Sequence, residues 1–187
     1  MKPLASIITV YISNIIAWCD ISFNDKTSNP LYYAKNLYLN NELIIELVIP
    51  ETVLKIKDYS FYNCSGLTSI TIGDSVTSIG YAAFSGCSGL TSITIGGSVT
   101  SIASCAFSNC SNLVSVVIPN SVNEIGFSTF SNCSNLTSIE FEDATSTWKR
   151  TTSTAHWNYS YEMDISNPQA NATYFTKYYD DYRWRKF

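Results

Sequence analysis

Apolar residues return at a fixed interval through the middle of the chain. Five columns, each of a single residue type, repeat with a step of 23 residues. The columns are Val53, Val76, Val99 and Val122; Ile56, Ile79, Ile102 and Ile125; Phe61, Phe84, Phe107 and Phe130; Cys64, Cys87, Cys110 and Cys133; and Leu67, Leu90, Leu113 and Leu136. Four full copies therefore occupy residues 47–69, 70–92, 93–115 and 116–138, and a fifth copy begins at Ile139 before it diverges. A fixed period in this range indicates a repeat architecture.

The order of apolar and polar positions inside one copy predicts its local structure. Residues 70–72 alternate apolar, polar and apolar, which is the period of a strand with one buried face. Gly73-Asp74-Ser75 then predicts a turn, after which Val76 and Ile79 return to the core. The apolar spacing over residues 81–90 predicts one or two short helical turns before the chain reverses into the next strand.

A single copy cannot enclose its own apolar residues, so each copy must stack on its neighbours. Each large side chain buried in this way contributes roughly 1.5–3 kcal/mol. Stacking pairs equivalent strands in a parallel sheet with a spacing of about 4.8 Å. We therefore predict a solenoid, in which the end coils need caps because they would otherwise expose apolar faces and strand edges.

The segment before the repeats predicts an N-terminal cap over residues 1–46. Asn40-Asn41 lies between two apolar segments, and asparagine tolerates the positive φ that a hairpin turn requires. Residues 10–18 are expected to form a divergent first coil that ends with a turn at Asn29-Pro30. The apolar stretch near the N-terminus is interrupted by polar residues and is not followed by small residues. We therefore interpret it as a structural element rather than a signal peptide.

The four full repeats span residues 47–138, and residues 139–187 combine the partial fifth repeat with a C-terminal cap. This cap is rich in aromatic residues, which we expect to cover the end of the core. Asp180-Asp181 predicts the turn of a final hairpin, with Thr173–Tyr178 and Tyr182–Phe187 as its strands.

Charge is scarce, and its distribution follows the repeats. Only 14% of the residues are charged, whereas serine, threonine and asparagine together account for 61 of 187. No Lys or Arg lies between Lys57 and Lys149, and Asp74 and Glu124 are the only charges in residues 59–139. Identical charges stacked from coil to coil would repel, whereas Ser, Thr and Asn can hydrogen-bond along the stack. The missing basic surface also excludes a nucleic-acid partner, and no apolar run is long enough for a transmembrane segment.

The four repeated cysteines have two interpretations. Stacking would bring them into a column whose spacing falls within disulfide range. Their 23-residue step does not match the short spacings of metal sites. We favour small buried thiols, because every coil repeats the cysteine identically and pairing would distort alternate coils.

The repeat unit resembles the BspA-like leucine-rich repeat. The residues that carry this resemblance in one copy are Ile70, Ile72, Val76, Ile79, Gly80, Phe84, Cys87 and Leu90. Lys57 and Ala103 depart from the glycine of the motif in the first and third copies. The resemblance implies a leucine-rich-repeat solenoid of right-handed stacked coils, β-rich within the α/β class. It also implies a bacterial cell-surface or secreted protein that acts in adhesion or protein binding, with no catalytic motif.

Candidate catalytic chemistry is sparse, so we predict no enzyme activity, cofactor or metal site. His156 is the only histidine, and no nucleophile-elbow, P-loop or dinucleotide glycine pattern occurs. Glu140, Glu142 and Asp143 form an acidic cluster that could act as a glycosidase carboxylate pair. An exposed acidic cap is the favoured interpretation of this cluster.

The outward positions of the repeated strands form the candidate binding site. They define a small, neutral concave face, which solenoids usually present to partners. The ten residues are Glu46, Val48, Ser69, Thr71, Ser92, Thr94, Ser115, Val117, Ser138 and Glu140. We expect a monomer that binds a protein partner, such as a host or matrix protein. One alternative is a passive spacer in a longer array, and another is a carbohydrate-binding surface protein that uses exposed aromatics such as Trp157.

Overall fold

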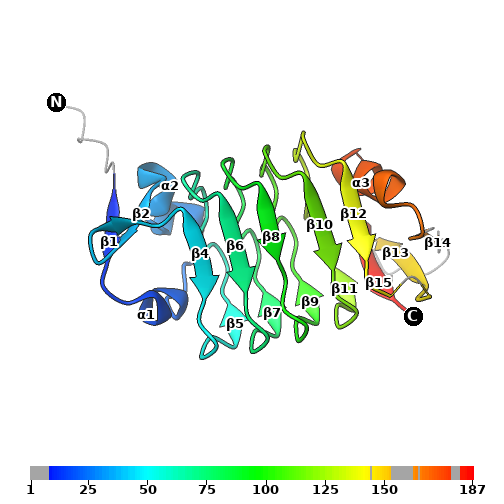
Figure 1. The fold of residues 1–187 in the computed structure, drawn as a ribbon, viewed down its shortest axis with the longest axis horizontal. Helices are drawn as coiled ribbons and strands as arrows, with labels where there is room; N and C mark the ends of the chain where they lie inside the picture. Colours follow the sequence, from blue (N-terminus) through cyan, green and yellow to red (C-terminus); the bar gives the residue numbers. More distant parts are fainter. Residues whose placement is uncertain (1–8, 144, 153–161, 164, 178–181) are drawn as a thin grey trace.

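The computed structural model describes residues 9–143, 145–152, 162–163, 165–177 and 182–187. The chain forms a row of stacked coils, with the N-terminal segment at one end of the row and the C-terminal segment at the other (Figure 1). Each coil contributes one longer strand, and these strands lie parallel and side by side. They are β4 (Glu46–Ile49), β6 (Ser69–Ile72), β8 (Ser92–Thr94), β10 (Ser115–Ile118) and β12 (Ser138–Phe141). The predicted leucine-rich-repeat type of solenoid is confirmed.

The longer strands pair in register with the repeat. Ile70 of β6 lies opposite Leu47 of β4 on one side and opposite Ile93 of β8 on the other. Each residue thus sits against its equivalent in the neighbouring coil. Inward apolar side chains alternate with outward ones, as the sequence pattern predicts, and the outward side chains are polar except for Val48 and Val117.

A second ladder of short parallel strands follows the turn of each coil and was not predicted. Its members pair in chain order. They are β5 (Lys55–Ile56), β7 (Ser78–Ile79), β9 (Ser101–Ile102) and β11 (Glu124–Ile125). Two residues are too few to show an alternating pattern, so the sequence revealed only the buried isoleucine of each strand.

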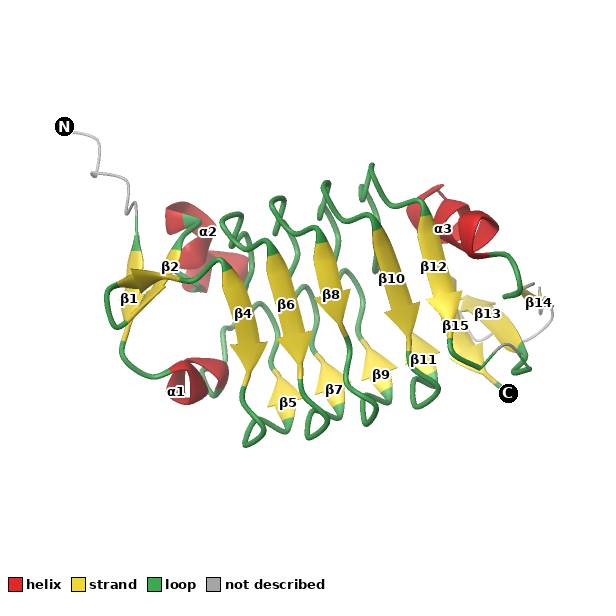
Figure 2. Ribbon diagram, in the orientation of Figure 1, coloured by secondary structure: helices red, strands yellow, loops and turns green. Residues whose placement is uncertain are grey.

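The segment predicted to form a helical turn forms tight non-helical turns instead. Figure 2 shows loop between the two strands of each coil and helices only at the two ends. The backbone N–H groups of Tyr59 and Phe61 donate to the carbonyls of Tyr81 and Ala83 in the next coil, at 2.9 and 2.7 Å. Because these donors bind to the next coil, they cannot donate to the residue four positions earlier, as a helix requires. Ala82 takes a left-handed conformation, with φ of 49°, at this point.

The core is built from the predicted columns. Phe61, Phe84, Phe107 and Phe130 are fully buried, and their rings stack almost in parallel with centroid distances of 5.3, 5.4 and 5.7 Å. The repeated Val, Ile, Cys and Leu residues surround this stack. Each coil therefore repeats the same set of contacts with its neighbour.

Polar residues also form ladders along the stack, as predicted. The hydroxyl of Thr91 donates to the carbonyl of Thr68 at 3.0 Å, and that of Thr100 donates to Thr77 at 3.1 Å. On another side of the coils, the amide of Asn132 donates to the side-chain oxygen of Asn109 at 3.0 Å. Neutral side chains therefore add bonds between coils without placing charges on one another.

The ladder of longer strands is interrupted between β8 and β10. Glu142 donates its backbone N–H to Ile118 at 3.0 Å, but the equivalent residue one coil earlier is Pro119, which has no N–H to donate to Ile95. The ladder is divided here into β4–β6–β8 and β10–β12, and the backbone N–H of Val114 lies 3.4 Å from the carbonyl of Thr91, against 2.9 Å between Thr91 and Thr68 one coil earlier. The second ladder continues across this point through β9 and β11.

The N-terminal cap begins with β1 (Val10–Ile12) and contains the predicted hairpin of β2 (Leu37–Leu39) and β3 (Glu42–Leu43). Asn40 and Asn41 at its turn have φ of 51° and 70°. Residues 1–8 of the apolar N-terminal stretch lie outside the described residues. Three short helical elements complete the cap. They are α1 (Ile15–Cys19), η1 (Lys26–Ser28) and α2 (Leu31–Ala34).

The C-terminal cap corrects a prediction. The expected final hairpin is wrong, because Pro168–Lys177 forms helix α3 and only Tyr182–Lys186, as β15, forms a strand. The side chain of Asn167 accepts the backbone N–H of Ala170 at 3.0 Å, and Pro168 begins the helix. The expected turn at Asp180-Asp181 lies outside the described residues.

Strand β15 closes the second ladder. It pairs antiparallel with β11 and with β13 (Trp148–Thr152), and β13 in turn pairs with β14 (Glu162–Met163). Helix α3 places Phe175 edge-on against Phe130, with ring centroids 5.9 Å apart. Trp148, Phe175 and Trp184 are buried and cover the end of the core, as expected for the aromatic residues of the tail.

Candidate functional site

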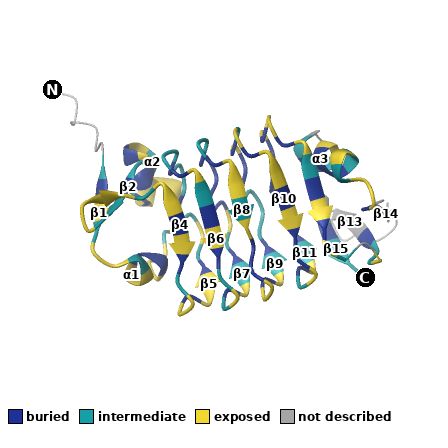
Figure 3. Cartoon of the chain, viewed as in Figure 1, coloured by how far each residue is buried: buried dark blue, intermediate teal, exposed yellow. Residues whose placement is uncertain are grey.

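The ten predicted site residues form one surface, which we call the strand face. Eight of them are exposed, and Ser69 and Ser138 are half-buried. Figure 3 shows exposed positions along the longer strands, most extensively on β4 and β10. The strands hold this face in position by backbone pairing, so its side chains stand on a fixed framework.

The register divides the strand face into two parts. Val48, Thr71 and Thr94 follow one another across β4, β6 and β8. Val117 lies opposite Glu140 in the separate pair formed by β10 and β12. The interruption between β8 and β10 falls between these two parts.

Apolar side chains interrupt the polar surface at two places. Val48 is 64% exposed and Val117 is 45% exposed, although threonine occupies the equivalent positions in the two coils between them. Sequence analysis missed Ile45 and Val114, which lie just before β4 and β10 and are also exposed. The sequence could have revealed both residues, because the equivalent positions of the neighbouring coils hold the polar residues Thr68 and Thr91.

The charge of the strand face is purely acidic. Glu46 and Glu140 are exposed at opposite ends of the face, and none of the ten residues is basic. Within the described residues, neither carboxylate forms an ion pair. The face therefore offers two solvated negative charges with neutral hydroxyl groups between them.

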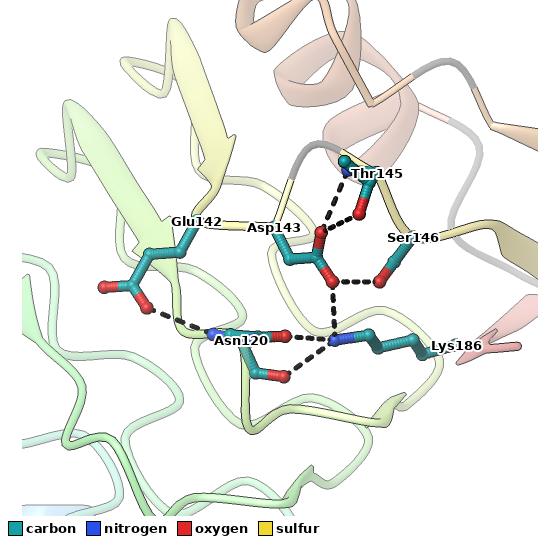
Figure 4. Close-up of polar contacts among 6 residues, drawn as sticks. All are labelled: Asn120, Glu142, Asp143, Thr145, Ser146 and Lys186. Atoms are coloured by element: carbon teal, nitrogen blue, oxygen red, sulfur yellow. Dashed lines mark hydrogen bonds and ion pairs between the residues drawn. The ribbon is translucent and has the colours of Figure 1, made fainter.

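Two members of the predicted acidic cluster are engaged in structural contacts (Figure 4). Asp143 accepts hydrogen bonds from the side chains of Ser146 and Thr145, and these bonds hold its pKa below the usual range. Lys186 lies 3.2 Å from Asp143 and also donates to Asn120. Glu142 accepts the backbone N–H of Asn120 at 3.1 Å. These contacts attach the end of the C-terminal cap to the fourth and fifth coils.

A group of five tyrosines lies on the turn side of the coils, away from the strand face. Neighbouring rings are 4.8 to 6.0 Å apart between centroids. The group joins α2 of the N-terminal cap to the first two coils and comprises Tyr32, Tyr33, Tyr59, Tyr62 and Tyr81. Sequence analysis did not single out this group. Trp157 and His156 lie outside the described residues.

The cysteines are free thiols, in agreement with the favoured interpretation. Cys87 donates to the carbonyl of Phe61 in the preceding coil at 3.3 Å, and Cys110 donates to that of Phe84 at the same distance. Burial raises the pKa of the Cys64 thiol to about 12 and keeps that of Cys87 well above its ordinary value. Such thiols are poor nucleophiles near neutral pH. In the described part of the chain, no three His, Cys, Asp or Glu side chains converge on a possible metal site.

Comparison with known families agrees with the repeat geometry. Residues 33–155 match the model of the BspA type leucine-rich repeat region with six copies. The chain belongs to this family. The six copies extend the four full repeats and the partial fifth that the columns reveal, because the match begins within the N-terminal cap and ends beyond β13.

Several solved structures resemble this BspA-type chain. A leucine-rich repeat protein of Bacteroides ovatus is 40% identical over 52% of this chain and 24% of its own, with a TM-score of 0.47. One of Bacteroides capillosus is 25% identical over 53% of this chain and 78% of its own, with a TM-score of 0.46. The pneumococcal vaccine antigen PcpA is 22% identical over 56% of this chain and 26% of its own, and its TM-score of 0.51 supports the shared fold. No curated protein matches the chain. Among the described residues, no helix has the length and apolar character needed to cross a bilayer.

Proposed function

We propose that this BspA-type chain is a non-enzymatic protein-binding module of a bacterial surface or secreted protein. Its strand face binds the partner, and it acts as a monomer. The observation that carries this proposal is the exposure of Val48 and Val117 on a rigid sheet surface. Stacking does not require these valines, since Thr71 and Thr94 occupy the same row. Ile45 and Val114 add exposed apolar side chains next to the same two strands, and apolar side chains that gather on one surface are typical of a binding site.

The family supports an adhesive role, with a host or matrix protein as the partner. The alternative is a passive spacer within a longer array, which needs no exposed valines on its strands. The two functions differ in one measurable property, because a spacer has no partner of its own.

Surface plasmon resonance tests the proposal with the full chain immobilised and a panel of purified extracellular matrix proteins in solution. Thr94→Arg places a long charged side chain in the middle of the strand face and is expected to abolish binding. Leu54→Arg is the matched control, because Leu54 is 63% exposed but lies outside this face. Equal loss of binding in both variants, or none in Thr94→Arg, would contradict a role for the strand face. Absence of any binding at micromolar concentration would favour the spacer.

A further inference from the structure

The two parts of the strand face carry the same pair of side chains. In β4, Glu46 and Val48 are two residues apart and project on the same side. In β10 and β12, Val117 and Glu140 lie directly opposite each other. All four are exposed. The face positions between these pairs contain only serine and threonine.

The spacing of the pairs is set by the coils. Val48 shares a row with Thr71 and Thr94, and Val117 is the equivalent residue of the next coil, three coils from Val48, so about 14 Å separates the two valines at the usual strand spacing. Glu140 lies one coil further along the row, about 19 Å from Val48. An extended peptide rises about 3.3 Å per residue, so its residues i and i+4 are about 13 Å apart and i and i+6 about 20 Å apart. Both are even steps, which place the side chains on one side of the peptide.

The charge of the pairs determines the charge of the occupant. Both carboxylates are solvated and unpaired within the described residues, and no basic side chain accompanies them on the face. A basic segment would therefore gain attraction at both ends, whereas an acidic one would be repelled. Arginine suits both carboxylates because its guanidinium binds a carboxylate through two hydrogen bonds.

Building on the protein-binding function proposed above, we propose that the strand face recognises an extended basic segment of a partner protein. The segment runs along the solenoid axis and has the pattern Arg-x-Val-x-x-x-Val-x-Arg. Its valines contact Val48 and Val117. One arginine continues along the row to Glu140, and the other extends sideways to Glu46, which lies beside Val48 in the neighbouring row. The pattern reads the same in both directions, so it fits either chain direction.

Three fluorescein-labelled peptides of equal length test the pattern by fluorescence anisotropy with the full chain. The first contains the pattern, with serine and glycine at the other positions. The second moves one valine so that the two lie at i and i+3, on opposite sides of an extended strand. The third replaces both arginines by glutamates. The first peptide is expected to bind at least about tenfold more tightly than either of the others, and less tightly at high salt.

Variants that restore the repeat consensus test which residues contact the peptide. Glu46→Ser with Val48→Thr, and Val117→Thr with Glu140→Thr, introduce the serine or threonine that other coils carry at the equivalent positions, so folding should be retained. Each pair is expected to weaken binding of the first peptide about tenfold, and all four together should remove the preference for the pattern. Leu54→Thr makes the same kind of change outside the strand face and should have no effect.

The outcomes separate this inference from the function on which it rests. Equal binding of the first and second peptides, or unchanged binding in the four-residue variant, overturns the recognition pattern. The protein-binding function is judged separately by Thr94→Arg, which would still abolish binding of a matrix protein if only the pattern were wrong. If the first peptide binds equally well to Thr94→Arg, the strand face is not its site.

Discussion

The repeat array and the two caps are held together in different ways. In the array, the same contacts recur in every coil, as in the stack of Phe61, Phe84, Phe107 and Phe130. In the caps, single side chains make contacts that occur once. The array therefore distributes its stability over many equivalent residues, whereas each cap depends on a few.

Two buried asparagines show how the caps replace a missing coil. Inside the array, the carbonyl of Tyr81 accepts an N–H from the preceding coil. Tyr59 has no preceding coil, and its carbonyl instead accepts the side-chain amide of Asn29 at 2.6 Å. At the other end, the carbonyl of Ile139 has no following coil and accepts the amide of Asn171 at 3.0 Å. Both asparagines are fully buried.

The largest expected effect comes from breaking the array at its centre. Phe107→Ala removes a fully buried ring that stacks on both sides and should lower the free energy of unfolding by about 3–5 kcal/mol. Urea denaturation followed by circular dichroism measures the change. Phe107→Leu, which keeps most of the volume, should cost less. A loss near zero for Phe107→Ala would show that the phenylalanine column does not hold the coils together.

The next largest loss of stability is expected from substitutions in the caps. Asn29→Ala leaves the buried N–H of Leu31 without its acceptor, and Asn171→Ala removes the donor to the carbonyls of Ile139 and Ile165, so each should cost about 1–3 kcal/mol. Asn135→Ala is the matched control, since its ladder bond to Asn112 is exposed and its loss should change stability by at most about 0.5 kcal/mol. The same denaturation experiment compares the three variants. Equal effects at all three positions would contradict the view that the caps depend on single residues.

The sequence predicts the array better than the caps for a physical reason. Each core position recurs four times, so the repeated residues identify the buried face independently of local propensity. The Asn40-Asn41 hairpin was also predictable, because its turn chemistry is local. In contrast, Thr173 and Phe175 have strand-forming side chains but belong to α3, which Asn167 and Pro168 initiate. Asn167 and Pro168 are a recognisable helix start, but the aromatic residues that follow led to the prediction of a strand.

The candidate site shows the same limit. Alternation within the strands predicted which residues of the ten would project outward. The division of the face between β8 and β10 was not predicted, because the 23-residue columns run through both coils without a change. Ile45 and Val114 were missed because they precede the alternating segment.

The buried thiols should make the stability of the array sensitive to alkaline pH. The folded pKa of Cys64, about 12, lies above its ordinary value of 9.0. Its contribution to stability is therefore full below pH 9.0 and is lost as the pH rises toward the folded pKa. Each such thiol should lower the free energy of unfolding by about 1.4 kcal/mol per pH unit above that point.

Denaturation at about pH 8 and about pH 10 measures this slope. The variant with Cys64→Ala and Cys87→Ala is expected to lose stability less steeply with pH than the native chain, whatever its stability at pH 8. Thiol labelling gives a second measurement, because the four buried repeat thiols should react only after unfolding, without a reductant. An identical pH slope in both proteins would indicate that these thiols do not remain protonated in the folded array.

The smallest expected effect concerns the ion pairs that join the C-terminal cap to the array. Glu124 of β11 lies 2.9 Å from Arg183 and 3.3 Å from Arg185 of β15, and all three side chains are partly exposed. Glu124→Gln should therefore cost less than about 1 kcal/mol, and the loss should shrink in high salt. Glu140→Gln, which removes an exposed carboxylate that forms no ion pair with a described residue, is the control. A loss of several kcal/mol, or one that salt does not change, would mean that β15 is held by these charges. Backbone pairing and the burial of Trp184 already account for its attachment to β11.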